Sequence, residues 1–155
     1  MTNPIVLEPV GHVRSSRAEA IDDGWDSVEA SNHLDGTKFG ADALAGLDAF
    51  SHVQVVFFFH GVPESAVISS ARHPRGRSDW PRVGIFAQRG KNRPNRIGVT
   101  ICRLVRVDGL SIVLQGLDAI DGTPVLDIKP CMRGFVPRGE IREPAWCAEL
   151  MKDYW

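Results

Sequence analysis

A cationic segment holds the residues of this sequence that are best suited to bind an anionic group. Residues 86–98 contain four arginine or lysine side chains, two glycines, two asparagines and one proline. So polar a segment is not readily buried, and it is predicted to be a loop between strands. Arginine and lysine bind phosphate and carboxylate groups, and Pro94 beside Asn95 favours a loop of defined shape. By charge alone, a solvated surface loop and a binding loop are about equally expected.

Two further segments offer groups that could act as an acid, a base or a ligand. His60 follows the most apolar run of the chain, and Asp118 and Asp121 follow a predicted hairpin. A lone histidine at a strand end more often has a structural role, because its ring readily completes a neighbour's hydrogen bonds. The two aspartates are either turn formers and helix caps, or they orient a ligand or accept a proton. The catalytic residue stays unassigned, with His60, Asp118 and Asp121 as candidates.

Several other kinds of chemistry are disfavoured. The three cysteines are widely spaced and form no CxxC pair, and this favours a reducing, cytoplasmic compartment over a disulfide framework. The histidines are scattered, so no metal site is predicted. No GxGxxG stands between a strand and a helix, so a Rossmann nucleotide site is not supported. The longest apolar run, 53–59, is too short to span a bilayer, and no secretory signal is visible at the N-terminus. We expect no membrane partner.

The charges are unevenly distributed, although the net charge is only -1. The acidic residues between positions 17 and 48 give way, between 72 and 96, to eight arginine or lysine residues and a single acidic one, Asp79. The net charge gives no overall attraction to nucleic acid. The uneven distribution nevertheless predicts a local basic surface around the cationic segment.

The elements that must position these groups are mostly short strands. Apolar alternation and β-branched or aromatic content predict strands at 5–14, 53–59, 67–70, 83–87, 99–107, 110–117 and 125–128. The near-continuous apolar run 53–59 is expected to be buried on both faces. Asp108 and Gly109 predict a type I′ hairpin turn. The proline- and arginine-rich stretch 73–82 is expected to be exposed and mobile.

Helices are predicted at two places only. Residues 42–49 could form a short helix weakened by Gly46, and Pro144 precedes a run typical of a C-terminal helix. Many short strands with irregular connections favour a mostly β protein, a small β-barrel or a sandwich. A chain of 155 residues is most simply one domain over 1–155.

Five stretches together resemble the TsaA-like (YaeB/TrmO, VirR-type) family. Residues 86–98 are similar to its Phe-Ala-Thr-Arg-Ser-Pro-x-Arg-Pro-Asn-Pro-Ile-Gly signature. Residues 47–53 and 57–60 resemble its Gly-Leu-x-x-Phe-Ser-His and Phe-x-Phe-His segments, and 116–130 resembles its most recognisable run. Residues 10–15 fit its first strand. The resemblance extends over most of residues 5–130, with the motifs in the same order.

The resemblance implies a small β-barrel that binds S-adenosylmethionine without a Rossmann fold. It implies methylation of the exocyclic amine of (threonylcarbamoyl-)adenosine next to the anticodon of tRNA, by a homodimer. By matching motif positions, the implied cofactor contacts are His60, Gly61, Arg89, Val99, Asp118, Ala119, Ile120 and Asp121. The implied contacts with the acceptor RNA are Lys91, Arg93, Asn95 and Arg96.

Three departures from the family pattern concern the substrate more than the cofactor. Gln88, the pair 90–91 and Arg96 replace Thr, Ser-Pro and Pro of the signature. Residues 24–27 replace a Pro-Arg-Gln tripeptide, so that Trp25, Asp26 and Ser27 are further candidates for cofactor contact. The chain is expected to lack the C-terminal extension of longer members.

Two other functions stay open. One is a module that binds S-adenosylmethionine or RNA without methyl transfer. The other is a methyltransferase for a small molecule. The homodimer has a simple alternative as well, because the apolar tail with Trp146, Tyr154 and Trp155 could pack on its own barrel.

Overall fold

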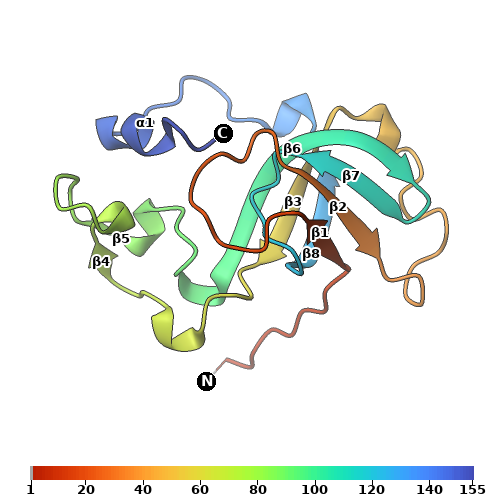
Figure 1. Ribbon diagram of the computed structural model, residues 1–155, viewed down its shortest axis with the longest axis horizontal. Helices are drawn as coiled ribbons and strands as arrows, with labels where there is room; N and C mark the ends of the chain where they lie inside the picture. The colour runs from red at the N-terminus through yellow and green to blue at the C-terminus, as the bar shows by residue number, and fades with distance from the viewer. Residues whose placement is uncertain (1) are drawn as a thin grey trace.

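Six antiparallel strands close into a barrel in the computed structural model, which describes residues 2–155. Around the barrel the order is β1-β2-β7-β6-β3-β8, and β8 pairs again with β1 (Figure 1). The strands are β1 (Gly11–Ser15), β2 (Glu29–Leu34), β3 (His52–Phe58), β6 (Ile97–Asp108), β7 (Ser111–Gln115) and β8 (Pro124–Pro130). The predicted small β-barrel is confirmed. Closure pairs every one of these six strands on both sides, so that the barrel has no free edge.

Strand β3 shows how the barrel divides inside from outside. Val53, Val55 and Phe57 are buried in the core, whereas the alternate residues Gln54 and Val56 are only half-buried. The prediction that this run is buried on both faces is therefore wrong. Continuous apolarity is typical of a sheet covered on both sides, but the wall of a small barrel has one packed inner face and one outer face.

The β6–β7 hairpin is confirmed, with a different turn from the predicted one. Asp108 pairs with Ser111, so Gly109 and Leu110 are the two central residues. Gly109 has φ of 60°, and Leu110 is not among the residues with positive φ. Positive φ at the first central position alone is the pattern of a type II′ turn rather than type I′. The predicted type I′ turn had Asp108 and Gly109 as its two central residues, whereas Gly109 is the first central residue in the structure.

Two predicted elements are shorter in the structure. The strand expected over 5–14 begins only at Gly11, and Ile5 is 87% exposed. Pro9 lacks the N–H that would continue the ladder towards the N-terminus. The helix expected over 42–49 is reduced to turns and a 3₁₀ helix, because Gly46 adopts the left-handed conformation at φ 85°.

A small arm stands beside the barrel and contains the basic stretch. It is built on β4 (Ala71–Arg72) and β5 (Val83–Gly84), which pair with each other only. The strand predicted at 67–70 is wrong, because β4 begins only after it at Ala71. The strand predicted at 83–87 ends at Gly84, where the 3₁₀ helix Ile85–Ala87 begins. The stretch 73–82 was expected to be exposed, but Trp80 is buried, since it packs against the C-terminal segment.

The predicted C-terminal helix is confirmed as α1 (Ala145–Met151), with Pro144 directly before it. In Figure 1 this helix lies beside the arm, above β4 and β5. Short 3₁₀ helices make up the remaining regular structure at Leu47–Ala49, Glu64–Ala66, Pro74–Gly76, Ile85–Ala87, Pro94–Arg96 and Arg133–Phe135. Among residues 2–155 there is no helix both long and apolar enough to cross a bilayer.

Candidate functional site

The antiparallel order brings three segments to one end of the barrel. Phe58 at the end of β3 pairs with Ile97 at the start of β6. Phe57 pairs with Val125 at the start of β8. The segment that follows β3, the loop that precedes β6 and the turn that precedes β8 must therefore lie together. They contain His60, the cationic segment 86–98 and the carboxylate turn 118–122. The convergence inferred from the sequence is thus present in the fold.

At this end of the barrel, close packing limits what can replace Gly98. A Cβ at this position would lie 2.5 Å from the ring of Phe57 and 2.9 Å from that of Phe59. The two rings meet edge to face, with their centroids 5.3 Å apart. Only glycine lets β6 approach them this closely. The end of the cationic segment is held against the aromatic end of β3.

The cationic segment is fastened by its own polar side chains. The Gln88 side-chain amide donates hydrogen bonds to the carbonyls of Arg72 and Val83 on the arm, at 3.1 and 2.9 Å. The Arg93 guanidinium donates to the Gln88 carbonyl at 2.7 Å. Asn92 donates to the carbonyl of Ala66 at 3.1 Å. The prediction of a shaped loop is supported by these bonds, which leave the loop little freedom.

Arg96 shows the same structural use of a charge. Its guanidinium donates to the carbonyl of buried Val62 at 2.7 Å and stands over the ring of Phe58, 4.7 Å from the centroid. Asn95 and Arg96 have φ of 61° and 50°, a left-handed conformation that asparagine tolerates better than most residues. Of the predicted RNA contacts, Arg93 and Arg96 are thus already occupied by backbone carbonyls, whereas Lys91 and Asn95 make no side-chain hydrogen bond within residues 2–155.

Arg89 and Val99, two predicted cofactor contacts, touch each other. The exposed Arg89 side chain reaches the first residues of β6 and donates a hydrogen bond to the Val99 carbonyl at 2.9 Å. This bond uses one of the five N–H donors of the guanidinium. The remaining donors leave Arg89 able to bind a carboxylate or phosphate.

Asp118 lies at the centre of the site and is half-buried. One of its carboxylate oxygens accepts a hydrogen bond from the Thr100 hydroxyl of β6, and the other accepts one from the Tyr154 hydroxyl. Burial and the Asp118 charge raise the pKa of Tyr154 above its ordinary value. Thr100 and Tyr154 were missed in the sequence. Their signals were faint: a polar residue on the inward face of β6, and the only tyrosine of the chain.

Cys102 is buried in the core, and its environment disfavours a role as a nucleophile. Burial and the Asp118 charge raise its pKa to about 12, so the thiolate is scarce at neutral pH.

His60 and Gly61 lie against the carboxylate turn. A Cβ on Gly122 would be 3.7 Å from the His60 Nε2 atom, and one on Gly61 would be 3.8 Å from the Ile120 side chain. His60 is exposed, whereas Ala119 is buried in the core. His60 and Ile120 are therefore placed to reach a ligand, while the Ala119 side chain packs inside the barrel.

Asp121 has a clear structural role. Its Oδ1 atom accepts a hydrogen bond from the Ser15 N–H at 3.0 Å, and its own N–H donates to the Arg17 carbonyl at 2.8 Å. These bonds tie the turn to the end of β1, as expected for a turn former. Asp121 also lines a cavity of about 370 Å³ together with Arg14 and Arg106.

The segment with Trp25, Asp26 and Ser27 lies beside the end of the chain. Trp25 is buried under the guanidinium of Arg17, which stands 4.2 Å from the ring centroid. The backbone N–H of Trp25 donates to the Tyr154 carbonyl at 2.9 Å. These contacts place the segment near Asp118 through Tyr154, and the Trp25 side chain itself is used in packing.

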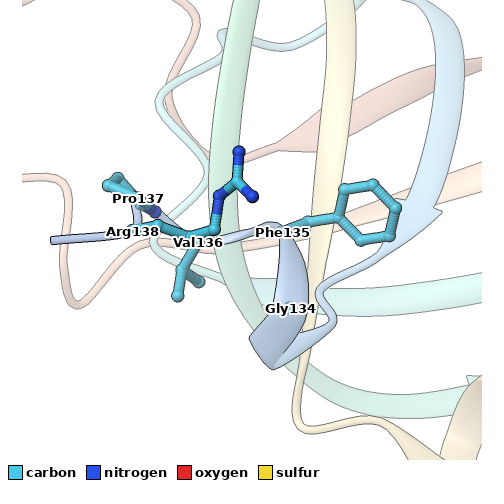
Figure 2. A pocket seen from close by; sticks show the side chains of 5 residues that line it. All are labelled: Gly134, Phe135, Val136, Pro137 and Arg138. Atoms are coloured by element: carbon cyan, nitrogen blue, oxygen red, sulfur yellow. The ribbon is translucent and has the colours of Figure 1, made fainter.

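A larger hollow lies elsewhere, along residues 134–138. It has a volume of about 870 Å³ and is lined by Gly134, Phe135, Val136, Pro137 and Arg138. Figure 2 shows that these residues come from one stretch of chain and that Phe135 points away from the others. A single curled segment without a carboxylate or histidine has no acid–base pair, so this hollow is not a candidate active site. Within residues 2–155 no group of three or more histidine, cysteine or acidic side chains is arranged to hold a metal ion.

The chemistry of the converging groups fits S-adenosylmethionine. That molecule offers a carboxylate, an ammonium, ribose hydroxyls and a sulfonium charge. Arg89 can bind the carboxylate, and Asp118 retains acceptor capacity for a hydroxyl or ammonium. The absence of a side chain at Gly61 leaves the approach to Ile120 open.

Comparison with known proteins decides the family. The profile described as the tRNA-methyltransferase O N-terminal domain matches residues 23–135. The chain belongs to this family. A crystal structure of TrmO from Pseudomonas aeruginosa superposes with a TM-score of 0.71 and 30% identity, over 92% of this chain and 62% of that one. The TrmO-like barrel is therefore shown by sequence and fold together, and the predicted family is confirmed.

Relatives of this chain differ in what their names state. A protein of Escherichia coli named tRNA (adenine(37)-N6)-methyltransferase is 39% identical over 80% of this chain and 56% of its own length. The human protein of the same name is 39% identical over 66% of this chain and 23% of its own. A protein of Methanothermobacter thermautotrophicus, 37% identical over 81% of this chain and 89% of its own, is named a probable S-adenosyl-L-methionine-binding protein. The chain spans about a quarter to just over half of the curated tRNA methyltransferases.

The contacts of Arg96 generate a test that separates structural from RNA-binding cations. Arg96→Ala leaves the buried Val62 carbonyl without its donor and removes the contact with Phe58, so we expect a loss of about 1–2 kcal/mol in the free energy of unfolding. Lys91→Ala, in the same segment, should change it by less than about 0.5 kcal/mol. Urea denaturation of both variants measures this difference. Equal stability of the two variants would contradict the structural role of Arg96.

Proposed function

We propose that this chain is an S-adenosylmethionine-dependent methyltransferase that acts on the exocyclic amine of (threonylcarbamoyl-)adenosine next to the anticodon of tRNA. The observation that carries the proposal is the convergence of Arg89, Val99 and Asp118 at one barrel end in a chain of this family. The names of the Escherichia coli and human relatives support both the reaction and its substrate.

The residues of the site suit a reaction that depends on alignment. S-adenosylmethionine supplies a methyl group already activated by its sulfonium charge, so the protein has mainly to hold donor and acceptor in line. Asp118 and Arg89 orient the cofactor in this proposal, with His60, Gly61 and the 119–121 turn around it. His60 is the group best placed to accept a proton, because it is exposed whereas the carboxylates of Asp118 and Asp121 already accept hydrogen bonds.

The acceptor side of the proposed site has fewer available charges than the sequence suggests. Arg75 and Arg77 pair with Asp23 and Asp79, and Arg93 and Arg96 bind carbonyls. Within residues 2–155, Arg82 and Lys91 make no ion pair or side-chain hydrogen bond. Phosphate contacts by the basic stretch 72–96 would therefore be few, and Lys91 and Asn95 lie in the loop that precedes β6.

Cofactor binding is the first prediction of this proposal. Isothermal calorimetry with S-adenosylmethionine should detect binding, and Asp118→Asn should weaken it about tenfold or more, because a hydrogen bond to a charged group is lost. Asp48→Asn, an exposed carboxylate on the 3₁₀ helix Leu47–Ala49, is the matched control and should bind as the original chain does. Absence of heat at high micromolar protein would remove the central claim.

Methyl transfer is the second prediction. Incubation with labelled cofactor and total tRNA should place the label in adenosine.

With few phosphate contacts, RNA affinity should fall far less between about 50 and 200 mM salt than the 10³–10⁵-fold loss typical of six to ten contacts. Label bound to protein but absent from tRNA would instead support a binding module, and the name of the Methanothermobacter relative states cofactor binding alone. Transfer to a small molecule, insensitive to salt, would support the remaining alternative.

We also propose that the chain forms a homodimer and that it works in the reducing cytoplasm. The tail packs on its own chain through Trp146 and Tyr154, so the aromatic tail no longer argues for a partner. Exposed apolar side chains gather instead in the segment that follows β8, where Phe135 is 88% exposed and Ile141 69%. Light scattering at micromolar concentration should give twice the chain mass, and the monomer mass would contradict the dimer. Cys102, Cys131 and Cys147 are free in the structure.

A further inference from the structure

The last eleven residues, 145–155, bridge the arm and the barrel, and we call them the tail. On the arm, the Trp80 indole N–H donates to the Glu149 carboxylate at 2.7 Å, and the Trp80 and Trp146 ring centroids are 6.4 Å apart. On the barrel side, the N–H groups of Gly24 and Trp25 donate to the carbonyls of Asp153 and Tyr154, each at 2.9 Å. These bonds hold the tail at both ends. Figure 1 shows the tail, in dark blue, between the arm and the loop that follows β1.

Tyr154 is the tail residue that reaches the candidate site. Its hydroxyl donates to one oxygen of the Asp118 carboxylate, while Thr100 donates to the other. The carboxylate is therefore oriented from two sides, by β6 and by the tail. Asp118 is only half-buried, so the barrel wall alone does not enclose it.

The two hydroxyl donors do not saturate the carboxylate. An ionised carboxylate has about four acceptor positions, so two hydrogen bonds leave room for a ligand hydroxyl or ammonium. Arg89 is tied to the same place, because its guanidinium donates to the carbonyl of Val99, the residue that precedes Thr100 on β6. Four segments far apart in the sequence, at residues 89, 100, 118 and 154, thus meet around one carboxylate.

We propose that the tail is part of the cofactor site and that Tyr154 is a positioning residue, which holds the Asp118 carboxylate in the orientation that binds the cofactor. This inference rests on the proposed function. It adds that the site is incomplete without the tail. A purely structural contact would anchor the tail without any effect on ligand affinity, and a blocking contact would compete with the ligand.

The first test needs no ligand, because Tyr154 is the only tyrosine of the chain. Ultraviolet titration of tyrosinate therefore reports this residue alone. Burial and Asp118 raise its pKa, so the folded protein should form no tyrosinate at pH values where a free phenol, of pKa about 10, ionises. In Asp118→Asn the transition should move down towards that value. A phenol that titrates normally in the original chain would overturn the inference, since the contact would be absent in solution.

The same contact should appear in the pH dependence of stability. The pKa of Tyr154 is higher in the folded than in the unfolded chain. Ionisation of this phenol therefore leaves the free energy of unfolding unchanged below about pH 10 and lowers it as the pH rises further. Tyr154→Phe removes this alkaline decline in part.

The second test measures cofactor affinity. Calorimetry with S-adenosylmethionine should show binding by Tyr154→Phe about tenfold weaker than by the original chain, with circular dichroism unchanged. The double variant with Asp118→Asn should bind no more weakly than Asp118→Asn alone, because the two residues act as one unit. Arg142→Gln, at an exposed residue that precedes the tail, is the control and should bind normally.

The outcomes separate this inference from the proposed function. Normal affinity of Tyr154→Phe, or additive losses in the double variant, would leave the proposed function intact and overturn the role of Tyr154. Tighter binding by Tyr154→Phe would show that the tail competes with the ligand, and it would overturn the inference too. If the original chain binds no S-adenosylmethionine, the proposed function fails and the inference fails with it.

Discussion

Pairing of β3 with β6 on one side and β8 on the other is the constraint on which the candidate site depends. Because these pairs are antiparallel, the end of β3 and the starts of β6 and β8 lie at the same end of the barrel. The buried residues Val53, Val55 and Phe57 hold this arrangement in the core. A slip of one residue would turn their side chains outward, so the packed core sets the register that brings the loops together.

The cationic segment shows why a count of charges is a poor measure of a binding surface. Arg93 and Arg96 satisfy backbone carbonyls that would otherwise be left without donors. Arg75 pairs with Asp23 from the acidic part of the chain. One cation of the basic stretch is thus paired with the acidic part of the chain, and fewer cations are without a partner than the sequence suggests.

Asp118 shows the opposite relation between sequence and structure. In the sequence it is one of two aspartates in a turn, with no sign of which matters more. In the structure Asp121 ties the turn to β1, while Asp118 accepts hydrogen bonds from two hydroxyls in distant segments. A half-buried carboxylate oriented in this way is suited to hold a ligand group in a fixed direction. The shape of the site therefore depends on the tail as much as on the barrel.

The sequence by itself determined the family, the small barrel, the β6–β7 hairpin and the three converging segments, because motif order and local apolar patterns are properties of the chain. Only the tertiary structure decided that β3 is packed on one face, that Trp80 is buried, and that Arg96 serves the fold. The same holds for the link between Tyr154 and Asp118, which are 36 residues apart. Such contacts depend on which elements lie together once the barrel has closed, and local helix and strand propensities carry no information about that.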